Sequence, residues 1–127
     1  MHIIGHGIDM VRIQRIKDEL DSKSKKWLDN IYSDEERLLA NSELVDFRYF
    51  AGRFAGKEAV VKALGTGFAG DVTWRGIEIL RKDNGAPYVR LNGEVLALSN
   101  SLGVTDWLIS ISYAGGLVMA SAIAVGD

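Results

Sequence analysis

The chain has 127 residues, 47% of them hydrophobic and 25% charged, with a formal net charge of −2 and no cysteine. This composition excludes extensive disorder, a broad basic surface for nucleic acid, disulfides and zinc-thiolate sites, and the length favours a single domain over residues 1–127. The opening "MHIIGHGIDMV" is too short and too polar for a signal peptide or a membrane span, so we expect a cytoplasmic protein without a membrane partner.

The first elements predicted along the chain are a strand and an amphipathic helix. Residues 2–8 are rich in β-branched residues and glycine, which favours a strand. Gly5 and Gly7 share one face of this strand, so another element is expected to pack closely there. Apolar residues at three- and four-residue spacing then predict a helix over 12–20. Asp9 is thereby expected where the strand gives way to the helix.

Three further helices are predicted between residues 24 and 64. A short one is expected at 24–32, and Ser33 with Glu36 has the spacing of a capping box that starts the next. From about residue 46 to Leu64 the chain contains no proline, and the following Gly65 suits the position just after a helix. We therefore expect one long helix that serves as a central scaffold.

The last third of the chain predicts hairpins around one more helix. Two extended runs flank Asn84-Gly85, a dipeptide that favours a turn, although Pro87 makes the loop longer than two residues. A helix over 94–103 and two strands around residues 114–116 follow. Because hairpins pair antiparallel strands and the helices come in blocks, we expect an α+β fold with an antiparallel sheet packed on the long helix.

The long helix carries charges that an apolar helix does not need. Hydrophobic residues cover nearly its whole circumference, yet Glu58 and Lys62 share one sector and Arg53 and Lys57 share another. On an exposed surface such pairs are common and add only a few tenths of a kcal/mol. In apolar surroundings each charge is costly unless it is paired or meets a charged ligand. Both readings stay open, and the second predicts that these side chains line a cavity.

Asp9 and Glu58 are candidate ligands of one divalent cation. Mg²⁺ needs few protein ligands when phosphate oxygens and water complete its shell. Asp9 could equally be a cap or turn residue. The "GTG" of Gly65, Thr66 and Gly67 offers backbone N–H groups and a hydroxyl to a phosphate, although a helix end followed by a loop explains the same glycines. One of the two interpretations of these residues is therefore a magnesium and phosphate site.

Four motifs in this order resemble one family. "GIDMVRIQRI", which contains Asp9, "RFAGKEAVVKALGTG", "NGAPY" and "SISY" extend over most of the chain. Together they resemble the holo-acyl-carrier-protein synthases, the small group of the 4′-phosphopantetheinyl transferases. The resemblance implies the 4′-phosphopantetheinyl transferase fold. It also implies transfer of 4′-phosphopantetheine from coenzyme A to a serine of an apo acyl carrier protein, with release of adenosine 3′,5′-bisphosphate.

The resemblance also implies residue roles. The residues matching Asp9 and Glu58 hold Mg²⁺ against the diphosphate, and the Glu58 carboxylate also orients the base that takes the serine proton. The ammonium matching Lys62 neutralises the leaving phosphate. Implied contacts to coenzyme A are Arg53, Lys57, Gly65, Thr66, Gly67, Asn84, Gly85, Pro87, Ser110, Ser112 and Tyr113. From the residues alone, the "NGAP" segment reads as a turn, and the two serines share one face of a strand and could simply be solvated.

One position departs from the family pattern, and two further partners are implied. The family usually has histidine where this chain has Tyr113, so a charge-assisted phosphate contact becomes a neutral hydroxyl. This departure motivates an alternative: a coenzyme A or nucleotide-binding protein of the same fold that lost turnover. A plain structural or oligomerisation domain is a third reading. The resemblance implies a homotrimer with its site between subunits, and Arg12 and Arg15 could meet an acidic carrier protein.

Overall fold

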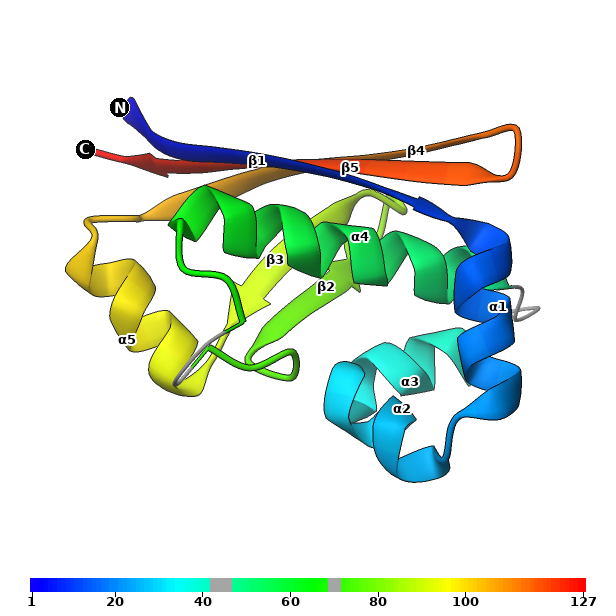
Figure 1. The fold of residues 1–127 in the computed structure, drawn as a ribbon. Helices are drawn as coiled ribbons and strands as arrows, with labels where there is room; N and C mark the ends of the chain where they lie inside the picture. The colour runs from blue at the N-terminus through cyan, green and yellow to red at the C-terminus, as the bar shows by residue number, and fades with distance from the viewer. Residues whose placement is uncertain (42–46, 69–71) are drawn as a thin grey trace.

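The computed structural model describes residues 1–41, 47–68 and 72–127. Helix α4 lies at the centre, beneath a three-stranded sheet, with a two-stranded sheet on its other side (Figure 1). Helices α1 to α3 gather at one end of the molecule and α5 lies at the other. The elements are β1 (His2–Arg12), α1 (Ile13–Ser22), α2 (Lys25–Ile31), α3 (Asp34–Asn41), α4 (Phe47–Leu64), β2 (Ile77–Arg81), β3 (Pro87–Leu91), α5 (Gly93–Ser101), β4 (Asp106–Ala114) and β5 (Leu117–Gly126).

Both sheets are antiparallel, which confirms the predicted α+β class. The larger sheet has the order β1-β5-β4, so β5 is central and β1 and β4 are its edges. Its β4–β5 turn is the two residues Gly115 and Gly116, whose φ angles of 56° and 78° suit glycine and produce a tight hairpin. Strands β2 and β3 form the predicted hairpin around Asn84-Gly85.

The helix boundaries follow the local signals in the sequence. The hydroxyl of Ser33 accepts a hydrogen bond from the Glu36 backbone N–H at 3.2 Å, and the Glu36 carboxylate accepts one from the Ser33 N–H at 2.9 Å. This is the predicted capping box at the start of α3. Helix α4 ends at Leu64, and Gly65 follows with a φ of 79°, as expected for the left-handed residue after a helix.

Helix α4 is the centre of the hydrophobic core. Its residues 49–57 are all buried, together with Ala59, Val60, Val61 and Leu64. A helix apolar on all sides needs cover on all sides, and the two sheets and α1 supply it. The prediction of a long scaffold helix is confirmed from Phe47; its expected first residue, Asp46, lies outside the described residues. No helix in the described segments is long and apolar enough to cross a membrane.

The expected position of Asp9 needs a correction. Strand β1 does not end near residue 8 but continues to Arg12, paired with β5 from His2↔Gly126 to Arg12↔Leu117. Asp9 therefore lies inside the strand, opposite Ala120, and not at the junction with α1. The polar Asp9 and the long Met10 obscured the strand in the sequence, because a strand half exposed at a sheet edge tolerates both residue types.

Candidate active site

Strand β1 and helix α4 meet through their backbones. A Cβ atom on Gly5 would lie 2.0 Å from the Ala63 carbonyl oxygen, and one on Gly7 would lie 1.9 Å from that of Ala59. Neither position can carry a side chain, which confirms the predicted close packing and identifies α4 as the partner. Alternate strand residues share one face, so Asp9 continues the row of Gly5 and Gly7 along the helix.

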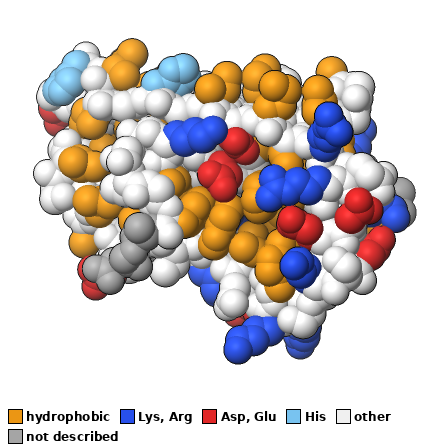
Figure 2. Space-filling model, viewed as in Figure 1, with side chains coloured by type: hydrophobic (Ala, Val, Ile, Leu, Met, Phe, Trp, Pro, Cys, Tyr) orange, Lys and Arg blue, Asp and Glu red, His pale blue; other side chains and the backbone are white. Residues whose placement is uncertain are grey.

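Asp9, Glu58 and Lys62 come together beside this contact. The Lys62 Nζ atom lies 3.1 Å from Asp9 Oδ1 and donates a 3.0 Å hydrogen bond to the carbonyl oxygen of Ile8. Glu58 is one turn before Lys62 on α4 and is half-buried, while the Asp9 side chain is 18% exposed. Acidic and basic side chains lie next to each other on this face, just below β1 (Figure 2).

Glu58 lies in an environment that favours a bound cation. Burial raises the pKa of Glu58 above its ordinary value of 4.5, and the negative charge of Asp9 raises that pKa further. Lys62 and Arg15 act in the opposite direction but leave the pKa raised. Arg15 is thus a neighbour of this site, although sequence reasoning connected it only with a carrier protein. Two partly buried carboxylates that repel each other gain stability when a cation binds between them.

The expectation that Lys57 contacts phosphate is corrected. Its side chain is fully buried, and Nζ donates hydrogen bonds to Glu36 Oε1 at 2.7 Å, to the Trp74 carbonyl at 2.9 Å and to the Ile77 carbonyl. An ammonium group has three donors, and all three are used inside the protein. Lys57 therefore belongs to a buried network and not to a ligand site.

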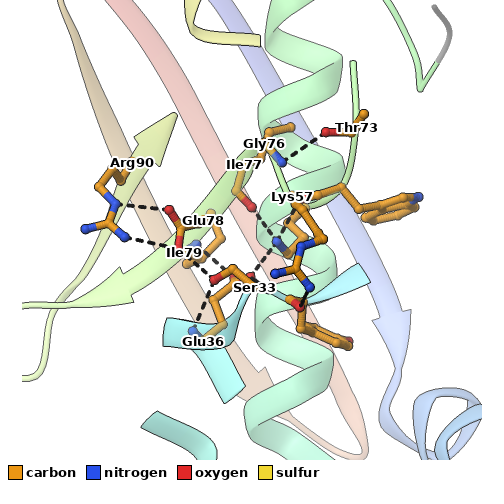
Figure 3. A network of polar contacts seen from close by, with 12 residues as sticks. Ser33, Glu36, Lys57, Thr73, Gly76, Ile77, Glu78, Ile79 and Arg90 are labelled. Carbon is orange, nitrogen blue, oxygen red and sulfur yellow. Dashed lines mark hydrogen bonds and ion pairs between the residues drawn. The ribbon is translucent and has the colours of Figure 1, made fainter. Parts of the chain in front are cut away.

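The buried network joins α3, α4 and the β2–β3 hairpin (Figure 3). The second carboxylate oxygen of Glu36 accepts a 3.0 Å hydrogen bond from the Ile79 backbone. Ser33 donates to Glu78 at 2.6 Å, and Arg90 binds the same carboxylate with two hydrogen bonds of 3.0 and 3.2 Å. Burial works to raise the pKa of Glu78, but hydrogen bonds from Arg90 and Ser33 outweigh it and lower that pKa. Every charge in this network has a partner of opposite charge.

A second group of predicted residues surrounds Tyr113 at the opposite edge of the sheet. Asp9 is on edge strand β1 and Tyr113 on edge strand β4, with β5 between them. Beside Tyr113 lies a cavity of about 150 Å³. It is lined by Arg53, Arg81, Gly85, Pro87, Ile111 and Tyr113. Four of the residues predicted to contact coenzyme A thus meet at one place, away from the Asp9 group.

The other predicted contact residues are placed differently. Ser110 and Ser112 are exposed on the face of β4 opposite to Tyr113, as the alternation predicted, so they do not line that cavity. The Asn84 side chain accepts a 3.0 Å hydrogen bond from the Ala86 N–H and so stabilises its own turn. Residues 65–67 form an exposed loop directly after α4, and Gly65 and Gly67 both have positive φ.

Few of the described side chains are placed to coordinate a metal ion. In residues 1–41, 47–68 and 72–127, no group of three or more His, Cys, Asp or Glu side chains is arranged to hold a metal ion. Asp9 and Glu58 provide two carboxylates. Two are sufficient for Mg²⁺ when a phosphate substrate and water provide the other ligands, and insufficient for a site built from protein alone.

Comparison with known sequences assigns the chain to a family. The profile of the 4′-phosphopantetheinyl transferase superfamily matches residues 5–117. The chain therefore belongs to the 4′-phosphopantetheinyl transferase superfamily. This assignment agrees with the resemblance of the four sequence motifs and with the α+β fold.

The relatives within this superfamily are holo-[acyl-carrier-protein] synthases. The protein of that name from Natranaerobius thermophilus is 42% identical over 125 residues, which cover 98% of this chain and 99% of the relative. The Neisseria meningitidis synthase superimposes with a TM-score of 0.90 at 30% identity, over 98% of this chain and 99% of that one. A Bacillus anthracis synthase solved with coenzyme A (3′,5′-ADP) gives 0.81 at 29% identity, with 98% of each chain covered. The chain is a phosphopantetheinyl transferase of this synthase group.

Proposed function

We propose that this enzyme transfers 4′-phosphopantetheine from coenzyme A to a serine of an apo acyl carrier protein and releases adenosine 3′,5′-bisphosphate. The observation that carries this proposal is the meeting of Asp9, Glu58 and Lys62 where β1 packs on α4. The names of the relatives and the coenzyme A bound to the Bacillus anthracis synthase support it. Residues 1–127 would act as one domain, in the cytoplasm, with a carrier of fatty acid biosynthesis as the first substrate to try.

Asp9 and Glu58 are proposed to hold Mg²⁺. The fit rests on two partly buried carboxylates near one another: burial raises the pKa of Glu58, and the charge of Asp9 raises it further. A bound Mg²⁺ would supply positive charge to the diphosphate of coenzyme A during phosphoryl transfer. Because the protein provides two carboxylates, the diphosphate oxygens and water would complete the coordination shell.

Glu58 and Lys62 are proposed to serve the two ends of the transfer. The Glu58 carboxylate would orient, directly or through a water molecule, the base that takes the proton of the attacking serine hydroxyl. Lys62 keeps its ammonium half exposed, so Nζ is able to leave Asp9 and neutralise the departing phosphate.

The nucleotide half of coenzyme A is proposed to bind in the group around Tyr113. Arg53, Gly85 and Pro87 line the small cavity there, and Asn84 shapes the turn that carries two of them. The loop of residues 65–67 follows Lys62 and would bind phosphate through its backbone N–H groups. For Ser110 and Ser112, a contact within one subunit is incompatible with their outward direction, so we propose contact across a subunit boundary.

A homotrimer with the site between subunits is proposed on two grounds. The two residue groups lie at opposite edges of the sheet, so one subunit's Asp9 group would meet the neighbour's Tyr113 group. The outer face of the same sheet exposes large hydrophobic side chains (Figure 2, upper edge). These are Ile8, Met10, Leu108, Leu117 and Met119, each 37–59% exposed. A further copy would cover them.

The trimer is tested by light scattering after size exclusion. Met10→Glu should give monomers with lost transfer activity, while the control Leu38→Glu changes an equally exposed side chain on α3 and should leave the trimer intact. A monomeric wild-type chain with full activity would reject the proposed assembly.

Helix α1 is proposed to meet the acidic helix of the carrier protein through Arg12 and Arg15. Both side chains are exposed, and Arg15 is close enough to Glu58 to lower its pKa. Arg15→Glu should slow modification of the carrier by at least tenfold without weakening coenzyme A binding. An unchanged rate would reject this docking surface.

The decisive experiment is a mass measurement on an apo acyl carrier protein. The carrier is incubated with coenzyme A, Mg²⁺ and the enzyme, and coenzyme A binding is titrated in parallel. A mass gain of one phosphopantetheine, lost with Asp9→Ala and with Glu58→Ala, is the expected result. Binding without a mass gain would favour the alternative of a coenzyme A-binding protein that lost turnover, for which Tyr113 is the motivation. If the chain neither binds coenzyme A nor increases the mass of the carrier, the reading as a structural domain remains.

A further inference from the structure

The loop after α4 is anchored at its first residue and open beyond it. The Gly65 N–H donates hydrogen bonds to two carbonyls in the last turn of α4, at 3.0 and 3.2 Å. A Cβ atom on Gly65 or on Gly67 would meet no atom within 4 Å, and the Thr66 hydroxyl donates only to the neighbouring Gly67 carbonyl within the described segments. The contact that holds the other end of this loop is therefore to be sought at the next residue, Phe68.

Phe68 stacks on Trp74, which lies shortly before β2. The two ring centroids are 3.8 Å apart and the ring planes differ by 14°. Trp74 also stacks on Phe54 of α4, with centroids 4.9 Å apart and planes that differ by 27°. Phe68 and Trp74 are both partly exposed, whereas Phe54 is buried. The rings thus tie the end of the loop to the central helix, and such stacking opposes the entropy cost of fixing a loop.

The backbone that carries Trp74 is held in place. Its carbonyl oxygen accepts a 2.9 Å hydrogen bond from Lys57 Nζ and a 3.2 Å hydrogen bond from the Ile77 N–H. The turn over residues 73–76 is closed by the N–H of its last residue, which donates to the hydroxyl of its first at 3.1 Å (Figure 3). Trp74 is therefore a fixed support for the Phe68 ring.

The loop between these two anchors presents free hydrogen-bond donors. In the part of the chain that the structure describes, the backbone N–H groups of Thr66, Gly67 and Phe68 donate no hydrogen bond. They come directly after the turn of α4 that carries the exposed Lys62. Consecutive unpaired N–H groups close to an ammonium suit an anion such as a phosphate. A loop that is already fixed binds such an anion at a smaller entropy cost than one that must first be ordered.

Resting on the proposed function, we propose that Trp74 is a positioning residue that keeps the N–H groups of residues 66–68 in place for the diphosphate of coenzyme A. Trp74 acts through its stack with Phe68 and needs no contact with the substrate. The loop holds the diphosphate both before and during the transfer, so a loosened loop weakens coenzyme A binding more than it slows the bound complex.

The test measures transfer kinetics for Trp74→Leu, which removes the stack. The KM for coenzyme A should rise about tenfold, as expected for the loss of hydrogen bonds to a charged group. The kcat and the KM for the carrier protein should change less than about threefold. Trp74→Phe keeps a ring for Phe68 and should recover most of the loss. The control Trp27→Leu removes a partly buried tryptophan from α2, at the other end of the molecule (Figure 1), and should leave the KM for coenzyme A unchanged.

A second variant keeps the test valid if Trp74→Leu folds poorly. Phe68→Leu removes the other half of the stack and leaves the contact between Trp74 and Phe54 intact. It should raise the KM for coenzyme A as Trp74→Leu does, and the double variant should be no worse than the weaker single variant, because both act through one stack. Melting temperatures identify the variants that are folded in the assay.

Hydrogen–deuterium exchange measures the loop directly. Saturating coenzyme A should slow exchange of the amides of residues 66–68 in the wild type and in Trp74→Phe. The same amides should continue to exchange rapidly in Trp74→Leu and in Phe68→Leu, even when these variants are saturated with coenzyme A. A role of Trp74 in core packing alone would not produce this difference.

The possible results are distinguishable. If the wild type binds coenzyme A and modifies the carrier, but Trp74→Leu and Phe68→Leu keep the wild-type KM and the protected loop, the role of Trp74 is wrong and the function stands. Equal rises of the KM for coenzyme A and for the carrier, without recovery in Trp74→Phe, would also overturn it. If the wild type neither binds coenzyme A nor modifies the carrier, the proposed function fails and this inference fails with it.

Discussion

Lys57 and Glu58 are consecutive residues on α4 and lie in opposite environments. Lys57 is fully buried and has Glu36 and two backbone carbonyls as partners. Glu58 is half-buried, next to another carboxylate, and its pKa is raised. The charge of Lys57 is neutralised within the chain. The negative charge of Glu58 would be stabilised by a bound cation. The helix thus separates a charge that stabilises the fold from a charge available for chemistry.

The difference shows what burial alone says about function. Lys57 is the more deeply buried of the two, yet its completed hydrogen bonds identify a structural role. Glu58 is the functional candidate because its neighbours do not neutralise it. In this fold the incomplete environment, rather than the degree of burial, marks the site.

Breaking the buried pair should have the largest effect on stability. Lys57→Met leaves the Glu36 carboxylate buried without its cation and should lower the free energy of unfolding by about 3–5 kcal/mol, measured by urea denaturation. The double variant Glu36→Gln/Lys57→Met should recover part of this loss, since no unpaired charge remains.

The matched control is an exposed pair of the same kind. Lys17 Nζ lies 3.1 Å from Asp21, and both side chains are largely exposed. Lys17→Met should cost no more than about 0.5 kcal/mol. Equal losses for Lys17→Met and Lys57→Met would show that burial does not distinguish the two pairs.

The neighbouring substitution Glu58→Gln should give the reverse result. Transfer activity should fall at least about a hundredfold if Glu58 holds the metal as proposed, because loss of a ligand exceeds the effect of losing a group that only orients one. The free energy of unfolding should stay within about 0.5 kcal/mol of wild type, since the repulsion from Asp9 is removed. A variant with wild-type activity would exclude Glu58 from the site.

Gly7→Ala probes the backbone contact that joins the two regions. Its methyl group would meet the Ala59 carbonyl oxygen at 1.9 Å, so β1 must move away from α4. We expect a loss of about 1–3 kcal/mol in stability and a loss of activity as Asp9 moves. In Gly56→Ala the nearest atoms are Ile79 and Ile109 side-chain carbons at 3.1–3.4 Å, which need to shift only a few tenths of an ångström, so the loss of stability should be smaller than for Gly7→Ala.

The smallest expected effect is a dependence of stability on pH. Because the pKa of Glu58 is raised on folding, the native state binds this proton more strongly than the unfolded chain does. The contribution of Glu58 is therefore complete below pH 4.5 and is lost as the pH rises through the raised pKa. Comparison of wild type with Glu58→Gln across this range, without divalent ions, should show the loss in the wild type alone. Asp9→Asn should reduce it.

The local part of the fold was predictable from the sequence. The capping box of Ser33 and Glu36, the stop at Gly65 and the Asn84-Gly85 turn depend on residues close together in the chain, and the structure confirms all three. The helical period also placed Glu58 with Lys62 and Arg53 with Lys57 in separate sectors of α4. These signals need no knowledge of tertiary contacts.

The sequence did not show whether each of these two sides of α4 faces the core or a ligand. The Arg53–Lys57 sector could face a ligand or the core, and the choice depends on Glu36, which lies in a different helix and was already explained by its capping role. In the structure Glu36 performs both tasks, since Oε1 accepts hydrogen bonds from the Ser33 N–H and from Lys57. The stacking of Arg48 on Tyr113 is another contact between distant segments that no spacing in the sequence reveals.

The glycine contact between β1 and α4 also limits which acids the site can use. The backbones of β1 and α4 are already in contact at Gly5 and Gly7 and cannot come closer. The gap between the two carboxylates is consequently bridged by side-chain length alone, with one methylene on the strand and two on the helix. Exchanging Glu58 for aspartate would preserve every charge and still withdraw a carboxylate by one carbon, which the two backbones cannot offset by approaching each other.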